Sequence, residues 1–133
     1  MFGSKLGGSS KNSFTTLIGA GTRVDGNIVF SGNLYVDGEV RGNIACENGL
    51  EGRLEISEKA SVEGSITVGH VVINGTVIGP VFAGELLELL PVARVTGDVE
   101  YHQIEIQQGA VIQGRLVHQV SAKAVELKLA SSK

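Results

Sequence analysis

Apolar and polar residues alternate along most of the chain, but glycine repeatedly takes the place of an apolar residue. Residues 34–44, LYVDGEVRGNI, show this clearly, because the inner series reads Leu34, Val36, Gly38, Val40, Gly42 and Ile44. Alternation with period two predicts a half-buried β-strand, whereas glycine weakens a continuous strand. We therefore expect very short strands separated by bends, with the glycines at crowded corners or at positive φ.

The same motif recurs along the chain. Residues 54–66 (LEISEKASVEGSI), 87–99 (LELLPVARVTGDV) and 104–116 (IEIQQGAVIQGRL) each read apolar-Glu-apolar, a spacer, a small residue and then apolar-x-Gly-x-apolar. Residues 24–28, 37–44 and 74–81 supply shorter units of the same kind. The marker glycines of the six units are Gly26, Gly42, Gly64, Gly79, Gly97 and Gly114, at spacings of 16, 22, 15, 18 and 17 residues.

A repeat of this length is too short for helix pairs or propeller blades. It fits one winding of a parallel β-helix, in which three short strands are joined at corners. An antiparallel sandwich is the alternative; it predicts turn signals every 8–12 residues but gives no reason for six aligned units. The pattern predicts an all-β, single-stranded parallel β-helix of about six windings.

The repeat divides the chain into three parts. Residues 1–16 are rich in Gly, Ser, Thr and Lys with little periodicity, which predicts a flexible tail. The β-helix domain is expected over residues 17–119. Residues 120–133 lie outside the repeat and are expected to form a C-terminal tail, although Val125, Leu127 and Leu129 alternate as in a short strand.

Composition narrows the class of protein. The 133 residues include 19 glycines, no tryptophan and only 5% aromatics, so aliphatic side chains must fill the core of one domain. A net charge of −3 gives no basic surface for nucleic acid. The single cysteine, Cys46, excludes an internal disulfide and suits a reducing compartment. No apolar run is long enough to span a bilayer, and no secretory signal core is present, so we expect a cytoplasmic protein.

Candidate catalytic and ligand-binding residues are few. His70, His102 and His118 lie 6, 5 and 4 residues after their marker glycines, so they drift out of register and are not expected to form one zinc site. No Gly-Lys pair occurs, so there is no P-loop. We expect no metal, cofactor or nucleotide, and no enzyme activity.

The glutamates of the repeat, Glu55, Glu88 and Glu105, take the outward position between two inward apolar residues. Paired carboxylates can act as acid and base, but a solvated outer face is the simpler interpretation. Like charges stacked about 4.8 Å apart would repel each other, and Arg53 and Arg94 are the basic residues placed to relieve this.

With the repeat laid out, residues 17–118 resemble the bactofilins, bacterial cytoskeletal proteins. The resemblance is carried by residues 24–28 (VDGNI), 34–44 (LYVDGEVRGNI), 71–81 (VVINGTVIGPV), 84–101 (GELLELLPVARVTGDVEY) and 104–114 (IEIQQGAVIQG), with the N-terminal MFGSK. It implies a right-handed β-helix that polymerises without nucleotide into non-polar filaments. Two departures stand out: Ile112 replaces a frequent phenylalanine, and no proline follows Pro91.

The resemblance also implies partners and a location. Some members bind the inner membrane through an N-terminal Met-Phe with a nearby lysine, which here are Met1, Phe2 and Lys5. Members organise cell-wall enzymes, including LytM-type peptidases, and affect cell shape or polar structures. By this resemblance the protein is expected at the inner face of the cytoplasmic membrane.

Physical reasoning independently favours self-association. Each end of a β-helix exposes unpaired strand edges and an open core, which solenoids normally cover with a cap. No amphipathic helix flanks either end of the repeat. The residues expected to form the polymer contacts are Ile18, Val24 and Ile28 in the first coil and Ile104, Ile106, Ile112 and Leu116 in the last.

Two alternatives remain at this point. A β-helical acyltransferase of the hexapeptide kind requires strict six-residue spacing and a catalytic histidine at a trimer interface, and the observed spacings argue against it. A β-helical scaffold that does not polymerise is the other.

Overall fold

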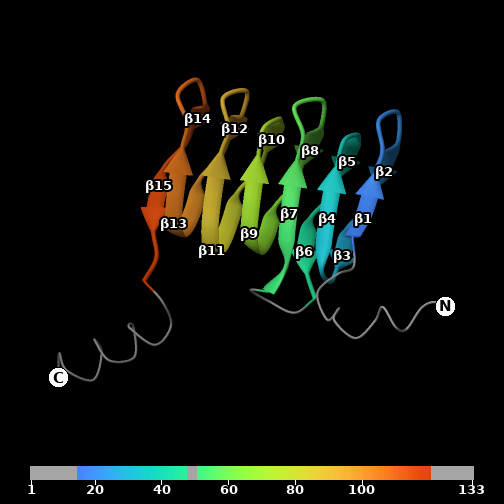
Figure 1. The fold of residues 1–133 in the computed structure, drawn as a ribbon, viewed down its shortest axis with the longest axis horizontal. Coiled ribbons are helices and arrows are strands. Elements are labelled where there is room, and N and C mark those ends of the chain that lie inside the picture. The colour runs from blue at the N-terminus through green and yellow to red at the C-terminus, as the bar shows by residue number, and fades with distance from the viewer. Residues whose placement is uncertain (1–14, 48–50, 121–133) are drawn as a thin grey trace.

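Residues 15–47 and 51–120 are described in the computed structural model, where they form a parallel β-solenoid (Figure 1). Each coil of the solenoid consists of three short strands, and each strand pairs in parallel with the equivalent strand of the next coil. One face contributes a six-stranded sheet with one strand per coil, so the solenoid has six coils. The expectation of an all-β, parallel β-solenoid with about six windings is confirmed.

The strands follow one another coil by coil. Coil 1 contains β1 (Thr15–Ile18), β2 (Arg23–Asp25) and β3 (Ile28–Phe30). Coil 2 contains β4 (Asn33–Val36), β5 (Glu39–Arg41) and β6 (Ile44–Cys46). Coils 3 to 6 contain β7 (Arg53–Ile56), β8 (Ser61–Glu63), β9 (Ile66–Ile73), β10 (Thr76–Ile78), β11 (Val81–Leu89), β12 (Arg94–Thr96), β13 (Val99–Ile106), β14 (Val111–Gln113) and β15 (Leu116–His118).

The coils stack into three faces. The first face consists of β1, β4 and β7 with the second halves of β9, β11 and β13. The second face runs through β2, β5, β8, β10, β12 and β14. The third face consists of β3 and β6, the first halves of β9, β11 and β13, and β15. The three long strands therefore turn the corner from the third face to the first and serve two successive coils.

The core is a set of aliphatic ladders that run along the solenoid axis. On the second face, register places Val24, Val40, Val62, Val77, Val95 and Ile112 one above another. The four central valines of this ladder are at most 1% exposed. Because the side chains of a strand alternate between its two faces, the polar residues of the same strands lie outside. The period-two pattern of the sequence therefore describes the real inside and outside of the coil.

The marker glycines form a column at the corner after the second face. Gly42, Gly64, Gly79 and Gly97 all have positive φ, which disfavours any residue with a side chain. A Cβ atom at Gly64 would overlap the carbonyl oxygen of Gly42 in the coil before it. The corner is thus both strained and crowded, which is why glycine interrupts the apolar series.

The strands extend slightly beyond the expected domain start. The first strand, β1, begins at Thr15, within the range that the sequence assigned to the N-terminal tail, and β15 ends at His118. The alternating residues Val125, Leu127 and Leu129 lie outside the described residues. Among residues 15–47 and 51–120 no helix is long and apolar enough to cross a membrane.

Candidate functional site

The N-terminal end of the solenoid presents an unpaired strand edge on every face. In the described structure, β1 pairs with β4, β2 with β5 and β3 with β6, and no strand lies on their other side. Figure 1 shows these three strands at the blue end of the solenoid. Backbone N–H and C=O groups on such an edge are ready to pair with another chain.

The same end has an apolar hollow. The predicted residues Ile18, Val24 and Ile28 lie together around it, with Phe30 and Leu34 completing the apolar wall. The hollow has a volume of about 460 Å³. Val24 and Ile28 are half-buried and pack against the core. We name the surface formed by β1, β2, β3 and this hollow the N-terminal end face.

The C-terminal end is more exposed. Ile104 and Ile112 are half-buried against the core, whereas Ile106 and Leu116 are each 49% exposed. All four occupy inward positions, because their register partners in coil 5 are Leu87, Val95, Leu89 and Val99. Those four partners are at most 1% exposed. We name this surface, formed by β14, β15 and the second half of β13, the C-terminal end face.

Comparing the exposure of inward side chains in the end coils with that in the middle coils shows that the two end faces consist of core residues that no further coil covers. In the middle coils the equivalent described side chains are buried, whereas Val24, Ile28 and the four inward residues of the last coil are accessible; Ile18 and Phe30 of the first coil remain buried. Burying an aliphatic side chain is worth about 1.5–3 kcal/mol. Covering either end face therefore provides a large driving force for association.

Sequence reasoning missed some apolar residues at these ends. Leu17 and Val29 lie on the outer surface of coil 1 and are 63% and 67% exposed. Val111, in the outward position of β14, is 40% exposed. The sequence gives no signal for them, because an outward aliphatic residue has no distinct pattern.

A charged pair borders the C-terminal end face. The carboxylate of Asp98 accepts a hydrogen bond from the backbone N–H of Arg115 at 3.0 Å and lies 3.3 Å from its guanidinium nitrogen. The hydrogen bond from the backbone N–H of Arg115 is the main reason why the pKa of Asp98 lies below its ordinary value, and the Arg115 guanidinium lowers this pKa further. Asp98 therefore stays charged and paired with Arg115 at neutral pH, at the corner where the last coil begins its third strand.

The histidines lie out of register, as expected. His118 pairs in register with Tyr101 and not with His102, although the rings of His102 and His118 come close, with centroids 6.2 Å apart. His70 is on the first face, where its Nε2 lies 3.5 Å from a carboxylate oxygen of Glu88. Among the described residues no group of three or more metal-ligating side chains forms.

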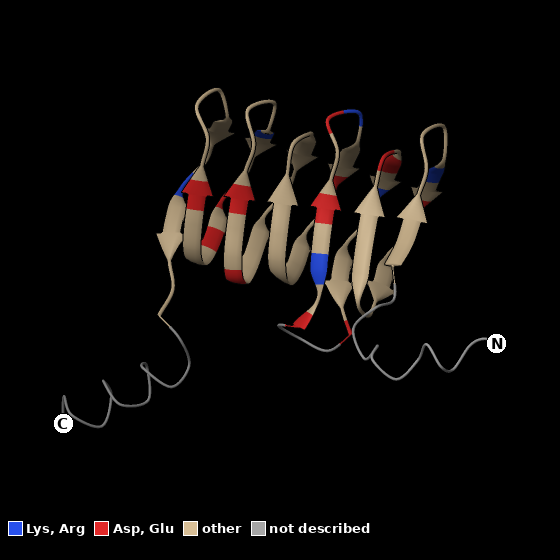
Figure 2. Ribbon diagram, viewed as in Figure 1, with Lys and Arg blue, Asp and Glu red and all other residues tan. Residues whose placement is uncertain are grey.

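The repeated glutamates alternate with inward aliphatic residues along the strands of the first face, so they point outward; Figure 2 shows acidic residues on these strands in red. Glu88 and Glu105 are direct neighbours in register, whereas Val72 separates Glu55 from Glu88. Arg53 lies 3.6 Å from Glu55, as expected. Arg94 does not serve the glutamates, because its guanidinium donates to the backbone carbonyls of Ala93 and Gly109.

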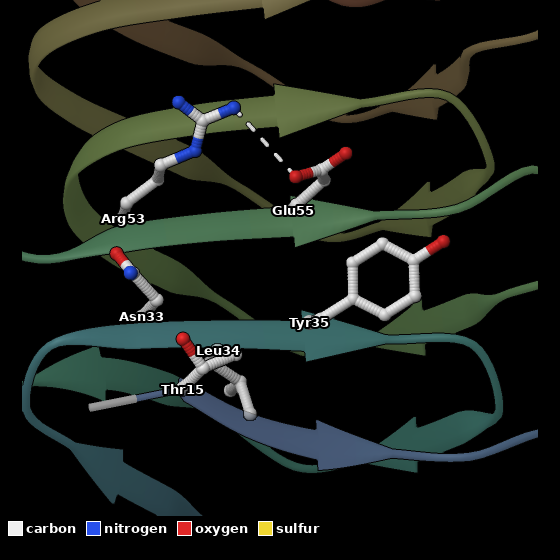
Figure 3. Close-up of a pocket in the computed structure, with 6 residues that line it drawn as sticks. All are labelled: Thr15, Asn33, Leu34, Tyr35, Arg53 and Glu55. Atoms are coloured by element: carbon white, nitrogen blue, oxygen red, sulfur yellow. Dashed lines mark ion pairs between the residues drawn. The ribbon is translucent and has the colours of Figure 1, made fainter. Parts of the chain in front are cut away.

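The first face also has a shallow hollow, of about 260 Å³ (Figure 3). Thr15, Asn33, Leu34, Tyr35, Arg53 and Glu55 line it. Arg53 and Glu55 pair with each other across neighbouring outward positions. The two charged side chains of this hollow therefore neutralise each other. None of its lining residues is a nucleophile with a general base beside it.

The residues expected to bind membrane, Met1, Phe2 and Lys5, lie outside the described residues. Cys46 is buried, with its Sγ close to Gly52.

Comparison with known proteins gives consistent results. Residues 16–117 match the family model described as bactofilin, polymer-forming cytoskeletal. The chain is 33% identical to Bactofilin BacO of Myxococcus xanthus strain DK1622 over 101 residues, which are 76% of this chain and 77% of BacO. It is 27% identical to Bactofilin BacP of the same strain over 108 residues, 81% of this chain but only 43% of BacP. No solved structure matches the chain.

Proposed function

This chain belongs to the bactofilin family of polymer-forming cytoskeletal proteins, and from that premise we propose that it assembles end to end into filaments without a bound nucleotide. The observation that supports this most directly is that, among the described residues, inward aliphatic side chains are partly or largely accessible in the first and last coils, whereas their register partners in the middle coils are buried. The two end faces, with Ile18, Val24, Ile28, Ile104, Ile106, Ile112 and Leu116, are the proposed polymer contacts.

The energetics favour junctions at these faces. Each junction would bury several aliphatic side chains at about 1.5–3 kcal/mol each and pair the free strand edges. Association costs about 4–15 kcal/mol in lost translational and rotational freedom. The proposed contacts number three aliphatic residues at the N-terminal end face and four at the C-terminal end face, several of them already partly buried, so apolar burial and strand pairing together must offset that cost.

The test is electron microscopy of the purified protein in moderate salt, without nucleotide and with a phosphatase present to remove any that co-purifies. We expect filaments one solenoid wide. Discrete trimers with acyltransferase activity, or monomers at all concentrations, would contradict the proposal and favour an enzyme or a non-polymerising scaffold.

We further propose that like ends meet, so that the filament has no polarity. Joining like ends makes each interface isologous, with the same residues on both sides of a two-fold axis. A filament of this kind cannot support directional transport, and it suits a static scaffold. Its role here would be to localise envelope enzymes, such as a LytM-type peptidase, at the inner face of the cytoplasmic membrane and so affect cell shape or polar structures.

Membrane binding is proposed to depend on the N-terminal residues Met1, Phe2 and Lys5 and on polymerisation together. Inserting two apolar side chains is worth only a few kcal/mol, and a lysine near anionic lipid adds about 1 kcal/mol. A filament displays many such tails, so later contacts become effectively intramolecular. We expect Phe2→Glu to release filaments from anionic liposomes in a pelleting assay while filament length stays normal.

The matched control for membrane binding is a variant that cannot polymerise but keeps its tail, such as Ile112→Arg. It is expected to lose liposome binding as well, because the small species that remains displays at most two tails, each of which binds only weakly. If Phe2→Glu still pellets with liposomes, the tail is not the anchor. If Ile112→Arg pellets like the parent, multivalency is not the mechanism.

A further inference from the structure

The second half of β13 ends the first face with an unpaired edge. Within the described chain, β15 pairs with residues 99–101 of β13, and no strand lies on the outer side of residues 103–106. Ile104 is half-buried there and Ile106 is exposed, although both occupy inward positions. This part of the C-terminal end face therefore has room for one more parallel strand.

The chain leaves β15 in the direction of this edge. The backbone N–H of Gln119 donates to the carbonyl oxygen of Tyr101 at 2.7 Å, and its side-chain amide donates to Glu100 at 3.1 Å. Its own carbonyl oxygen lies 3.2 Å from Nδ1 of His102. These contacts hold the chain along β13 at the corner where β13 turns onto the first face. At Val120 the chain is therefore beside the free edge.

The sequence that follows has the pattern of a first-face strand. Residues 121–133, which lie outside the described residues, contain Leu127 and Leu129 with Lys128 between them. Apolar residues at alternate positions fit a strand with one buried side. The first-face strands of coils 3, 5 and 6 have the same order, apolar, charged and apolar, at residues 54–56, 87–89 and 104–106.

The length of the connection also fits. The three-residue strands β6 and β15 both belong to the third face, and they end at Cys46 and His118. Leu54 and Ile104 lie in one register column of the first face. Seven residues, 47–53, connect Cys46 to Leu54, and eight residues, 119–126, separate His118 from Leu127. A connection of nearly this length therefore already joins two coils of the same solenoid.

Charge selects the register of such a strand. Glu105 is exposed, its register neighbour is Glu88, and no lysine or arginine among the described residues pairs with it. With both leucines inward over β13, Lys128 lies beside Glu105, and opposite charges in register stabilise two strands. A shift by two residues would place Glu126 there instead, as a further like charge.

We propose that residues 121–133 bind back onto the C-terminal end face of their own chain as one more first-face strand, with the two leucines over Ile104 and Ile106 and Lys128 beside Glu105. The segment then covers part of the surface that a second copy needs, so it competes with the C-terminal junction. The inference rests on the proposed function, because it concerns the regulation of that junction.

The competition depends on protein concentration. A tethered segment acts at an effective concentration on the order of millimolar, and its occupancy is the same in dilute and concentrated protein. The junction joins two chains, so its occupancy rises with concentration. If the segment covers the face about nine-tenths of the time, the apparent affinity of the junction falls about tenfold. Assembly then begins only above a threshold that the segment sets.

The first experiment measures the C-terminal junction alone. Val24→Arg blocks the N-terminal end face, so the dissociation constant of the remaining contact can be measured by analytical ultracentrifugation, with Val24→Arg alone if like ends meet or mixed with Ile112→Arg if they do not. Adding Leu127→Ser and Leu129→Ser to Val24→Arg is expected to lower this constant about tenfold, as is removal of residues 121–133. An unchanged or higher constant would overturn the proposal.

Hydrogen exchange tests the register in the full-length chain, kept below the concentration at which it assembles. We expect the backbone amides around Lys128 to be protected, and Lys128→Glu to reduce that protection about 2–5-fold. Glu105→Lys should do the same, and the two together should restore it. The matched control Lys123→Glu makes the same charge change in the connection and should have no effect. Failure of the double variant to restore protection, or an equal effect of the control, would overturn the proposal.

The outcomes separate this inference from the proposed function. Filaments from a chain whose segment amides exchange freely would reject the bound segment and leave the polymer intact. Protected segment amides in a chain that forms no junction at any concentration would keep the bound segment and reject the polymer.

Discussion

Replacing Ile112 by arginine is expected to abolish filaments and leave a small, folded species. Ile112 ends the valine ladder of the second face and packs half-buried against the core, with its outer side at the C-terminal end face. An arginine there places an unpaired charge in a closed apolar junction, at a cost of several kcal/mol. Within a monomer the longer side chain can extend into solvent. Sedimentation and electron microscopy measure the assembly, and circular dichroism checks the fold.

The size of the species that remains in the Ile112→Arg variant also shows whether the filament is polar. If like ends meet, Ile112→Arg blocks only the C-terminal junction, and the intact N-terminal end faces still pair, so the product is a dimer. If the filament is head-to-tail, every junction uses one C-terminal face, and the product is a monomer. Analytical ultracentrifugation distinguishes the two outcomes directly.

A variant at the opposite end face tests filament polarity independently. Val24→Arg changes the equivalent ladder position at the N-terminal end face. In a non-polar filament each variant alone forms dimers, and mixing them creates no new contact. In a head-to-tail filament each variant alone is monomeric, but mixing pairs the one intact face of each and produces a mixed dimer.

The control for the charge itself is Gln113→Arg. Gln113 neighbours Ile112 on β14 but points outward and is exposed. This variant adds the same side chain to the same strand at an outward position, away from the inward aliphatic residues proposed as the contacts. Normal filaments from Ile112→Arg, or loss of filaments from Gln113→Arg, would reject this contact.

The fold was predictable because its determinants are periodic. Each coil needs inward aliphatic residues at alternate positions and a glycine at one crowded corner, so both features recur in the sequence. The same reasoning found the inward residues of both end faces, since the first and last repeats have no neighbour to cover them.

What could not be predicted depends on geometry that has no period. Strands β9, β11 and β13 turn a corner without a break, and β11 has a register shift between Ala83 and Leu86. At such a corner, side chains that are out of register can still come close, as the rings of His102 and His118 do, and no spacing in the sequence predicts this proximity. Arg94 was misassigned because its guanidinium reaches backbone carbonyls at a turn, and no sequence pattern indicates that contact.

The second large effect is expected at the glycine column, where Gly64→Ala should destabilise the fold. Gly64 has φ of 146°, and adding Cβ would overlap the carbonyl oxygen of Gly42. Its N–H also donates to the carbonyl of Ile78 at 2.9 Å, so the backbone cannot move away without losing pairing with the next coil. Positive φ costs about 1–3 kcal/mol, and overpacking adds about 1–3 kcal/mol.

Gly26→Ala is the matched control for this substitution. Gly26 occupies the same corner in coil 1, with φ of 138°, but a Cβ there meets nothing within 4 Å, because no coil precedes it. It therefore carries the cost of positive φ without the overlap, about 1–3 kcal/mol. The difference between the two variants measures the contact between coils alone.

Both glycine variants are best compared in a background that carries Ile112→Arg and Val24→Arg together and so blocks both end faces, since association would otherwise add to apparent stability. Urea unfolding gives the free energy of unfolding of each. We expect Gly64→Ala to lose about 2–6 kcal/mol in all, a large share of the 5–15 kcal/mol typical of a domain, and Gly26→Ala to lose clearly less. Equal losses would mean that backbone conformation, and not the stacking of one coil on the next, is the reason for glycine at this corner.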